Sequence, residues 1–259
     1  MKAAWTITKK ELKSFLYSPI AYILTAFFLL ISGFFFYNIV VWVNDQAMRM
    51  MQYQAQYGGG AAQIDVNRML YEPFFNNMTI ILMFLLPLLT MRLFADEKKM
   101  RTEEMLLTSP AKISSIIFGK YLAALIIYAI ILLLTATFSL FVFANGNPEL
   151  TPVLTAYLGL FLLGSVFIAI GVFASSLTEN QVIAAAISFS TILLIWVLSW
   201  VGESTGSSWH GVLTYLSFFS HFQNMVKGVV DTQDVIYYLT FAFMGLYLTY
   251  SAFEFRKWR

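Results

Sequence analysis

The only dense charge cluster in the chain lies between residues 91 and 110, with a long apolar run on either side. It mixes both signs: Arg92, Asp96, Glu97, Lys98, Lys99, Arg101, Glu103 and Glu104. A charge at the bilayer centre costs roughly 2.5–3.5 kcal/mol on insertion scales, so this segment must lie outside the membrane. Opposite charges four residues apart, as at Glu97 and Arg101, predict a helix. We expect a charged helix at a membrane face that docks a soluble partner or serves only as a solvated connector.

Other residue types that support catalysis or metal binding do not fall into recognisable motifs. There is no G-x-x-x-x-G-K-[ST] loop, because the one Gly-Lys pair, Gly119-Lys120, is followed by Tyr121. No Ser, His and Asp residues match a hydrolase motif. His210 and His221 stand apart from any partner ligand in the sequence, and the chain has no cysteine. We therefore expect no enzyme, no bound cofactor and no metal site.

Three methionines, Met48, Met50 and Met51, leave one metal hypothesis open. Thioethers are soft ligands that bind copper(I). Methionine is also an unbranched helix former, so a helix near the membrane surface explains these residues as well.

The composition is that of an integral membrane protein. Hydrophobic residues make up 59% of the 259 residues and charged residues only 12%, about half the roughly 25% of soluble domains. The net charge of +2 implies no nucleic-acid partner. The absence of cysteine leaves the redox compartment undetermined.

Residues 2–18 are expected to form an amphipathic helix that lies in the membrane interface. One face carries Trp5, Thr8, Leu12, Phe15 and Leu16, and the other carries Lys2, Thr6, Lys9, Lys10 and Lys13. Such lysines face anionic lipid headgroups. Pro19 then breaks the helix and turns the chain into the bilayer.

Six apolar segments are long enough to cross a bilayer. They cover residues of about 20–43, 74–91, 115–143, 152–174, 182–201 and 235–253 of a single transmembrane domain, 1–259. Pro87 is expected to kink the second span, and Gly159, Gly164 and Gly171 are expected to be close-packing positions in the fourth.

Residues 213–230 repeat apolar side chains at helical spacing but are too polar to cross the membrane. They should pack over the outer ends of the spans, as a static cap or as an outer gate over a pathway between paired chains. The gate hypothesis assigns its residues as Phe219, Phe222, Gln223 and Gly228. Gly228 would be the hinge because glycine tolerates backbone angles closed to other residues.

The distribution of basic residues sets the expected orientation. Thirteen Lys and Arg residues lie on the side of the two termini and the charge cluster, counting Lys120 with that side, against three on the other. This places both termini in the cytoplasm. Because Lys120 is counted on the cytoplasmic side, no Asp, Glu, Lys or Arg remains in the interior of a predicted span. This argues against a proton pump or an ion-coupled transporter.

ABC-2-type permeases carry a signature that this chain resembles at residues 87–98, at Thr102, Glu104 and 106–110, and at Gly119-Lys120. Within them it is most similar to the gliding-motility-associated permease subunits. Further marks of the resemblance are residues 10–12, 175–181 and 218–234. The chain departs from the family at Arg101, where Gly is common, and at Glu103, where an apolar residue is usual. We therefore expect a more continuous helix here.

The resemblance implies a six-span, type-V-exporter-like subunit of a bacterial inner-membrane transporter. Residues 2–18 would be its elbow helix, and residues of about 93–107 would contain the coupling helix that meets a cytoplasmic ABC ATPase. The coupling residues would be Arg92, Phe94, Glu97, Lys98, Arg101, Glu104 and Leu107. Two permease chains would pair within membrane lipid, and ATP would be bound by the partner ATPase.

The leading functional hypothesis is thus an ATP-driven permease subunit that works as an exporter. A non-transporting membrane scaffold of a motility or envelope assembly is the alternative, and it should work with a hydrolysis-dead ATPase. An intramembrane enzyme is disfavoured because the spans lack catalytic groups. Neither the substrate nor the choice between a homodimer and a heterodimer follows from the sequence.

Overall fold

The computed structural model describes residues 2–57, 65, 67–102, 111–146, 148–204 and 210–257, which form helices and contain no strand. The helices are α1 (Lys2–Tyr17), α2 (Pro19–Tyr57), the π-helix η1 (Asn67–Tyr71), α3 (Glu72–Thr90), α4 (Arg92–Lys99), α6 (Ile113–Asn145), α7 (Leu150–Leu177), α8 (Gln181–Ser204), α9 (His210–Leu216), α10 (Phe218–Val226) and α11 (Thr232–Lys257). The predicted all-α class is confirmed.

Six of these segments, within the described residues, are long and apolar enough to span a membrane, as predicted. They correspond to α2, α3, α6, α7, α8 and α11. Helices suit the lipid bilayer because the backbone N–H and C=O groups form their hydrogen bonds within the same segment.

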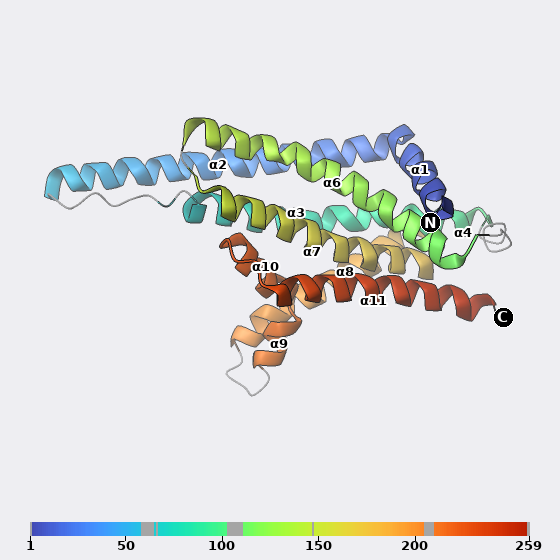
Figure 1. Cartoon of the computed structure of the whole chain (residues 1–259). Helices are drawn as coiled ribbons and strands as arrows, with labels where there is room; N and C mark the ends of the chain where they lie inside the picture. The colour runs from blue at the N-terminus through green and yellow to red at the C-terminus, as the bar shows by residue number, and fades with distance from the viewer. Residues whose placement is uncertain are drawn as a thin grey trace.

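The first spanning helix is much longer than the apolar run that predicts it. α2 contains 39 residues and continues unbroken through the polar residues 44–57. At 1.5 Å per residue it is about 58 Å long, roughly twice the hydrocarbon thickness of a bilayer. Figure 1 shows its far end projecting beyond the other helices. The helix persists because no Gly or Pro occurs between Phe34 and Tyr57.

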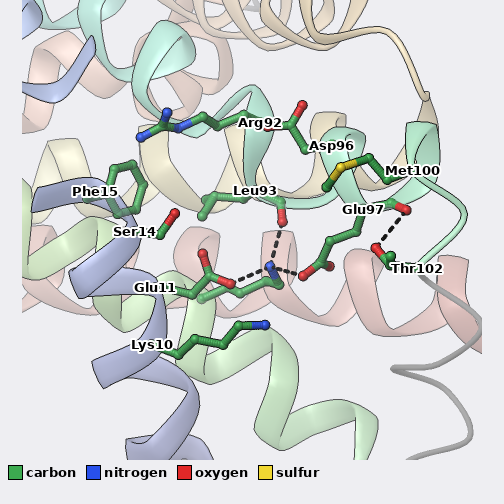
Figure 2. Close-up of a pocket in the computed structure, with 11 residues that line it drawn as sticks. Lys10, Glu11, Ser14, Phe15, Arg92, Leu93, Asp96, Glu97, Met100 and Thr102 are labelled. Atoms are coloured by element: carbon green, nitrogen blue, oxygen red, sulfur yellow. Dashed lines mark hydrogen bonds and ion pairs between the residues drawn. The ribbon is translucent and has the colours of Figure 1, made fainter. Parts of the chain in front are cut away.

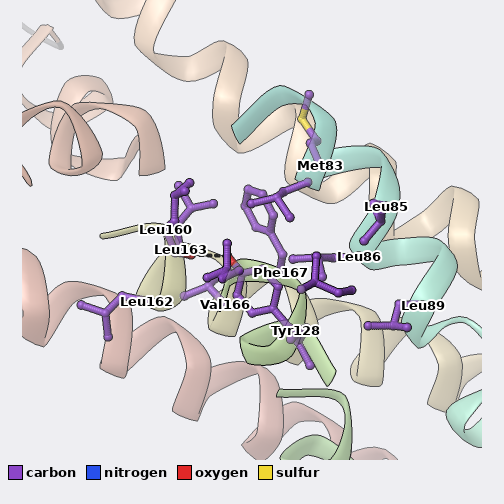
Figure 3. Close-up of a cluster of buried hydrophobic side chains, with 14 of the residues drawn as sticks. Met83, Leu85, Leu86, Leu89, Tyr128, Leu160, Leu162, Leu163, Val166 and Phe167 are labelled. Atoms are coloured by element: carbon purple, nitrogen blue, oxygen red, sulfur yellow. Dashed lines mark hydrogen bonds between the residues drawn. The ribbon is translucent and has the colours of Figure 1, made fainter. Parts of the chain in front are cut away.

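Helix α7 lies at the centre of the bundle and packs against α3, α4, α6, α8, α10 and α11. Its glycines allow this close packing. A Cβ at Gly159 would lie 3.0 Å from Met225, and one at Gly164 or Gly171 would clash with Tyr128 or Thr90. Figure 3 shows the surrounding buried cluster, in which side chains of α3 and α7 meet Tyr128.

Both termini lie at one end of the bundle, together with α4 (Figure 1). We call this the terminal end. The projecting part of α2, the connection between α6 and α7, and α10 lie toward the opposite end, which we call the distal end.

Helix α1, which is the expected elbow, packs closely against α6. Thr8 and Phe15 are buried, whereas Trp5 and Leu16 of the predicted apolar face are about half exposed. A Cβ at Gly119 would lie 2.8 Å from the Ala4 carbonyl oxygen, so only glycine lets α1 lie this close. α1 ends before Ser18, and α2 begins at Pro19, where the sequence predicts the turn.

The segment predicted as one helix over residues 213–230 consists of two helices, α9 and α10. The break falls at Ser217, whose backbone is extended and whose hydroxyl caps α10 by accepting a hydrogen bond from the Phe219 N–H. Serine commonly begins a helix in this way, so the apolar repeat continues across a break that it does not reveal.

Candidate functional site

A buried ion-pair junction joins three helices at the terminal end. The Lys120 Nζ donates to Glu11 Oε1 at 2.8 Å, to Glu97 Oε1 at 2.8 Å and to the Leu93 carbonyl oxygen at 2.7 Å. Figure 2 shows these bonds converging between α1, α4 and α6. Lys120 is only 1% exposed, and all three protons of its ammonium group have an acceptor. We call these four residues the α4 junction.

The α4 junction borders a polar cavity of about 550 Å³ between α1 and α4. Lys10 and Ser14 of α1 and Arg92 and Asp96 of α4 also line this cavity. Its lining holds three cations and three carboxylates, and Lys120 is the most deeply buried of the cations. A deeply buried lysine is stable here because two carboxylates compensate its charge.

Arg92 ties the start of α4 to the corner between α1 and α2. Its Nη1 donates to Ser18 Oγ at 2.7 Å, and its guanidinium group lies 4.9 Å from the centre of the Phe15 ring. The charged group of Arg92 is therefore engaged inside the protein and stabilised by a cation–π contact.

Ser175 and Ser176 of α7 fasten α4 from the other side. Ser175 Oγ accepts from the N–H groups of Phe94 and Ala95, at 2.9 and 3.0 Å, and donates to the Met91 carbonyl oxygen at 2.8 Å. These bonds hold the backbone of the first turn of α4 against α7. The buried Lys98 Nζ donates to the Ser176 carbonyl oxygen.

Two further contacts link α4 to α8 and α11. Gln181 Nε2 donates to Asp96 Oδ1, and the rings of Phe94 and Phe253 lie 4.9 Å apart. α4 is thus fixed to five helices: α1, α6, α7, α8 and α11.

The exposed surface of this region lies at the end of α4. Lys99, Met100 and Arg101 are exposed, with Met100 at 67%. Arg101 has a φ of 55°, the left-handed conformation that favours glycine. The predicted continuous helix is therefore wrong: α4 ends at Lys99, and Arg101 takes the glycine-like turn itself. Glu103, Glu104 and Leu107 lie outside the described residues.

The predicted coupling residues divide into an internal set and a surface set. Phe94 and Lys98 are buried, and Glu97 bonds to Lys120 rather than to the Arg101 that helical spacing predicts. These residues anchor α4, whereas Arg101 lies on the surface. The alternative of a solvated connector is therefore wrong for the face of α4 that carries Phe94 and Lys98, because this face is buried.

Sequence reasoning did not assign a role to Glu11, Lys120, Ser175 or Gln181. One signal was available: a lysine inside an apolar helix needs a carboxylate, and Glu11 is the lone acid among the lysines of α1.

The predicted outer-gate residues lie in and just after α10. Phe222 is fully buried and packs on Gly159, and Gln223 Nε2 donates to Asn76 Oδ1 at 2.9 Å. Phe219 is half-buried. Gly228 has a φ of 89° and lies against Pro152, so this position does require glycine.

His221 joins α10 to α9 and α11 and was not predicted to be paired. Its Nδ1 lies 2.5 Å from Asp234 Oδ1, and its Nε2 lies 2.9 Å from the Tyr215 carbonyl oxygen. The ring is therefore held through both of its nitrogen atoms, between the end of α9 and the start of α11. The Tyr237 ring stacks on it at 4.0 Å.

The described residues thus combine six candidate membrane-spanning helices, an N-terminal elbow and a short helix fastened at the terminal end, an arrangement that suits the membrane component of a transporter. The model of the ABC-2 family transporter proteins matches residues 5–255, and the chain belongs to this family. It is a multi-pass transmembrane permease of an ABC transporter. No curated protein matches the chain.

Proposed function

We propose that this chain is the permease subunit of an exporter driven by a separate ABC ATPase, which docks at the exposed end of α4. Both termini and α4 would then face the cytoplasm of a bacterial inner membrane, as the basic residues on that side indicate. We also propose that two such chains pair and that the gliding-motility-associated permeases are near relatives.

The single observation that carries the proposal is the α4 junction. A helix that transmits force must not move independently of the spans. Glu97 ties α4 to Lys120 of α6, Lys120 in turn binds Glu11 of α1, and Ser175 ties α4 to α7. A displacement applied at Met100 would therefore reach several spans at once. The exposed Lys99, Met100 and Arg101 supply a charged and apolar docking edge.

We further propose that α10 serves as the outer gate. Opening would require Phe222 to leave Gly159, Gln223 to release Asn76, and the Thr155 hydroxyl to release the Met225 carbonyl oxygen, to which it donates at 2.7 Å. Gly228 would be the hinge. The same contacts also suit a static cap, and transport experiments distinguish the two.

The test is purification of the tagged chain from its native membranes, followed by identification of the bound subunits. We expect an ABC ATPase in fixed stoichiometry that hydrolyses ATP in the complex. Recovery of the chain without any ATPase would overturn the proposal. If a hydrolysis-dead ATPase still supported the cellular function, the scaffold hypothesis would replace it.

A further inference from the structure

A second groove, separate from the polar cavity at α4, lies between α1, α6 and α11 near the terminal end. Its volume is about 770 Å³, within the roughly 300–1,000 Å³ of sites that bind small ligands. Trp5 of α1, Ile117, Phe118 and Leu122 of α6, and Leu246 and Tyr250 of α11 are among its lining residues. The lining is almost entirely apolar, apart from hydroxyl groups.

Because α6 and α11 are both long and apolar enough to span a membrane, this groove would face the hydrocarbon rather than water. It is formed by the first turns of α6 and by residues 243–250 of α11, and both helices are candidate spans. Phe118 and the groove residue Phe243 are 48% and 70% exposed, as is normal for side chains that face lipid. Trp5 and Tyr250 add to the lining two aromatic side chains of the kinds that favour the boundary between hydrocarbon and headgroups.

Exposed lysines lie close in the chain to residues that line the groove. Lys9 is exposed, and its Nζ lies 5.7 Å from the centre of the Trp5 ring. Lys112 is also exposed and precedes the groove residue Ser114 by two positions. Lys13 follows Lys9 on the same side of α1. The groove thus combines an apolar floor with a positively charged edge.

We propose that this groove binds one anionic phospholipid from the leaflet at the terminal end. An acyl chain would lie between Leu122 and Leu246, and the phosphate group would lie at Lys9 and Lys112. Attraction to an anionic surface amounts to about fivefold in affinity for each basic residue near it. This lipid site goes beyond the proposed transport function and does not depend on it.

The lipid would help to hold α1 in place. Trp5 in the groove and Glu11 in the α4 junction lie on the same helix, less than two turns apart. Removal of the lipid should therefore loosen α1 and, through Glu11, the α4 junction. A bound lipid stabilises the folded protein in proportion to its occupancy.

The test uses the full chain in nanodiscs that contain photoactivatable phosphatidylglycerol or, in a parallel sample, photoactivatable phosphatidylcholine with the same acyl chains. Adducts are mapped by mass spectrometry. We expect phosphatidylglycerol to label Phe118, Leu122 and Leu246 at least about fivefold more than phosphatidylcholine does. Both lipids should label Leu133 and Leu194, two exposed positions outside the groove, equally.

Substitutions separate the headgroup from the acyl chain. Lys9→Gln and Lys112→Gln should lower the preference for phosphatidylglycerol, whereas Lys10→Gln, on the neighbouring lysine that lines the polar cavity, should leave it unchanged. Leu122→Trp, or Leu246→Trp if the first variant does not fold, should abolish labelling in the groove by either lipid. Phosphatidylglycerol should also raise the thermal unfolding temperature of the unmodified chain more than that of Lys9→Gln.

Three outcomes would overturn the proposal. Equal labelling of the groove by both lipids would remove the headgroup preference. Labelling spread evenly over the exposed apolar residues would mean that only bulk lipid covers the groove. Cross-links from one chain to another at Phe118 would mean that a second copy of this chain covers it.

Discussion

Lys120 is a buried cation whose hydrogen-bonding capacity is fully used inside the chain, by two carboxylates and one carbonyl group. A buried ion pair adds little net stability to a protein, but the loss of one partner leaves a buried charge uncompensated. The value of Lys120 therefore lies in fixing where α1, α4 and α6 meet. Glu97 has the same role from the side of α4.

Lys120→Met should destabilise the chain by about 3–5 kcal/mol, because Glu11 and Glu97 would face each other without a cation. The measurement is the free energy of unfolding in mixed detergent micelles. Adding Glu11→Gln and Glu97→Gln should restore part of the loss. Lys227→Met, at an exposed lysine outside both the α4 junction and the lipid groove, is the control and should change stability by no more than about 0.5 kcal/mol. A Lys120→Met variant as stable as this control would contradict the role of the junction.

At the scale of helices, the close approach of α1 to α6 depends on Gly119. A Cβ there would lie 2.8 Å from the Ala4 carbonyl oxygen and 3.0 Å from Ile7, and both belong to the elbow. Backbone cannot rotate away as a side chain can, so α1 would have to shift. The elbow is therefore the element that is most sensitive to the size of a single side chain in α6.

Gly119→Ala should destabilise the chain by about 1–3 kcal/mol and make Thr8, now 1% exposed, accessible to solvent or lipid. The free energy of unfolding measures the loss of stability, and hydrogen exchange of α1 measures the exposure. Gly211→Ala in α9 is the matched control, since nothing lies within 4 Å of its Cβ, and alanine should be neutral or stabilising there by up to about 1 kcal/mol. Equal effects of the two substitutions would argue against a tight contact at Gly119.

The gate role of α10 can be tested with a chain that has no cysteine of its own. With Gln223→Cys in each chain of a pair, a disulfide or a short thiol cross-linker should slow the ATP hydrolysis of the complex several-fold, and reduction should restore it. The pair must lie within disulfide or linker reach. If the cross-link forms and the full rate persists, α10 is a static cap.

At the scale of the whole molecule, the sequence predicts what depends on local composition. The six spans follow from apolar length, and the turn at Pro19 follows from the chemistry of proline. Three features do not follow. The bonds of Lys120 join residues 109 and 23 positions apart, the break at Ser217 interrupts a continuous apolar repeat, and Arg101 takes a turn that its side chain disfavours. The first depends on tertiary contacts and the other two on local capping and turn geometry, and a periodic pattern encodes neither.

The proposed orientation can be measured with a matched pair of substitutions. Met51, in the projecting part of α2, and Met100, beside α4, are 66% and 67% exposed and lie at opposite ends of the molecule. In intact cells, Met51→Cys should react with a membrane-impermeant thiol reagent and Met100→Cys should react only after permeabilisation. Gly59→Cys and Ser109→Cys, outside the described residues, should behave likewise. The reverse pattern would place the termini outside.

The central claim, that α4 is where an ABC ATPase docks, is tested most directly by the amount of ATPase recovered with two glutamate variants. Met100→Glu should lower recovery about tenfold or more, which corresponds to a loss of about 1.4 kcal/mol or more of binding energy, because a charge would enter the apolar part of the docking edge. Met51→Glu, equally exposed at the distal end, should leave recovery unchanged. Unchanged recovery with Met100→Glu, or an equal loss with Met51→Glu, would contradict docking at α4.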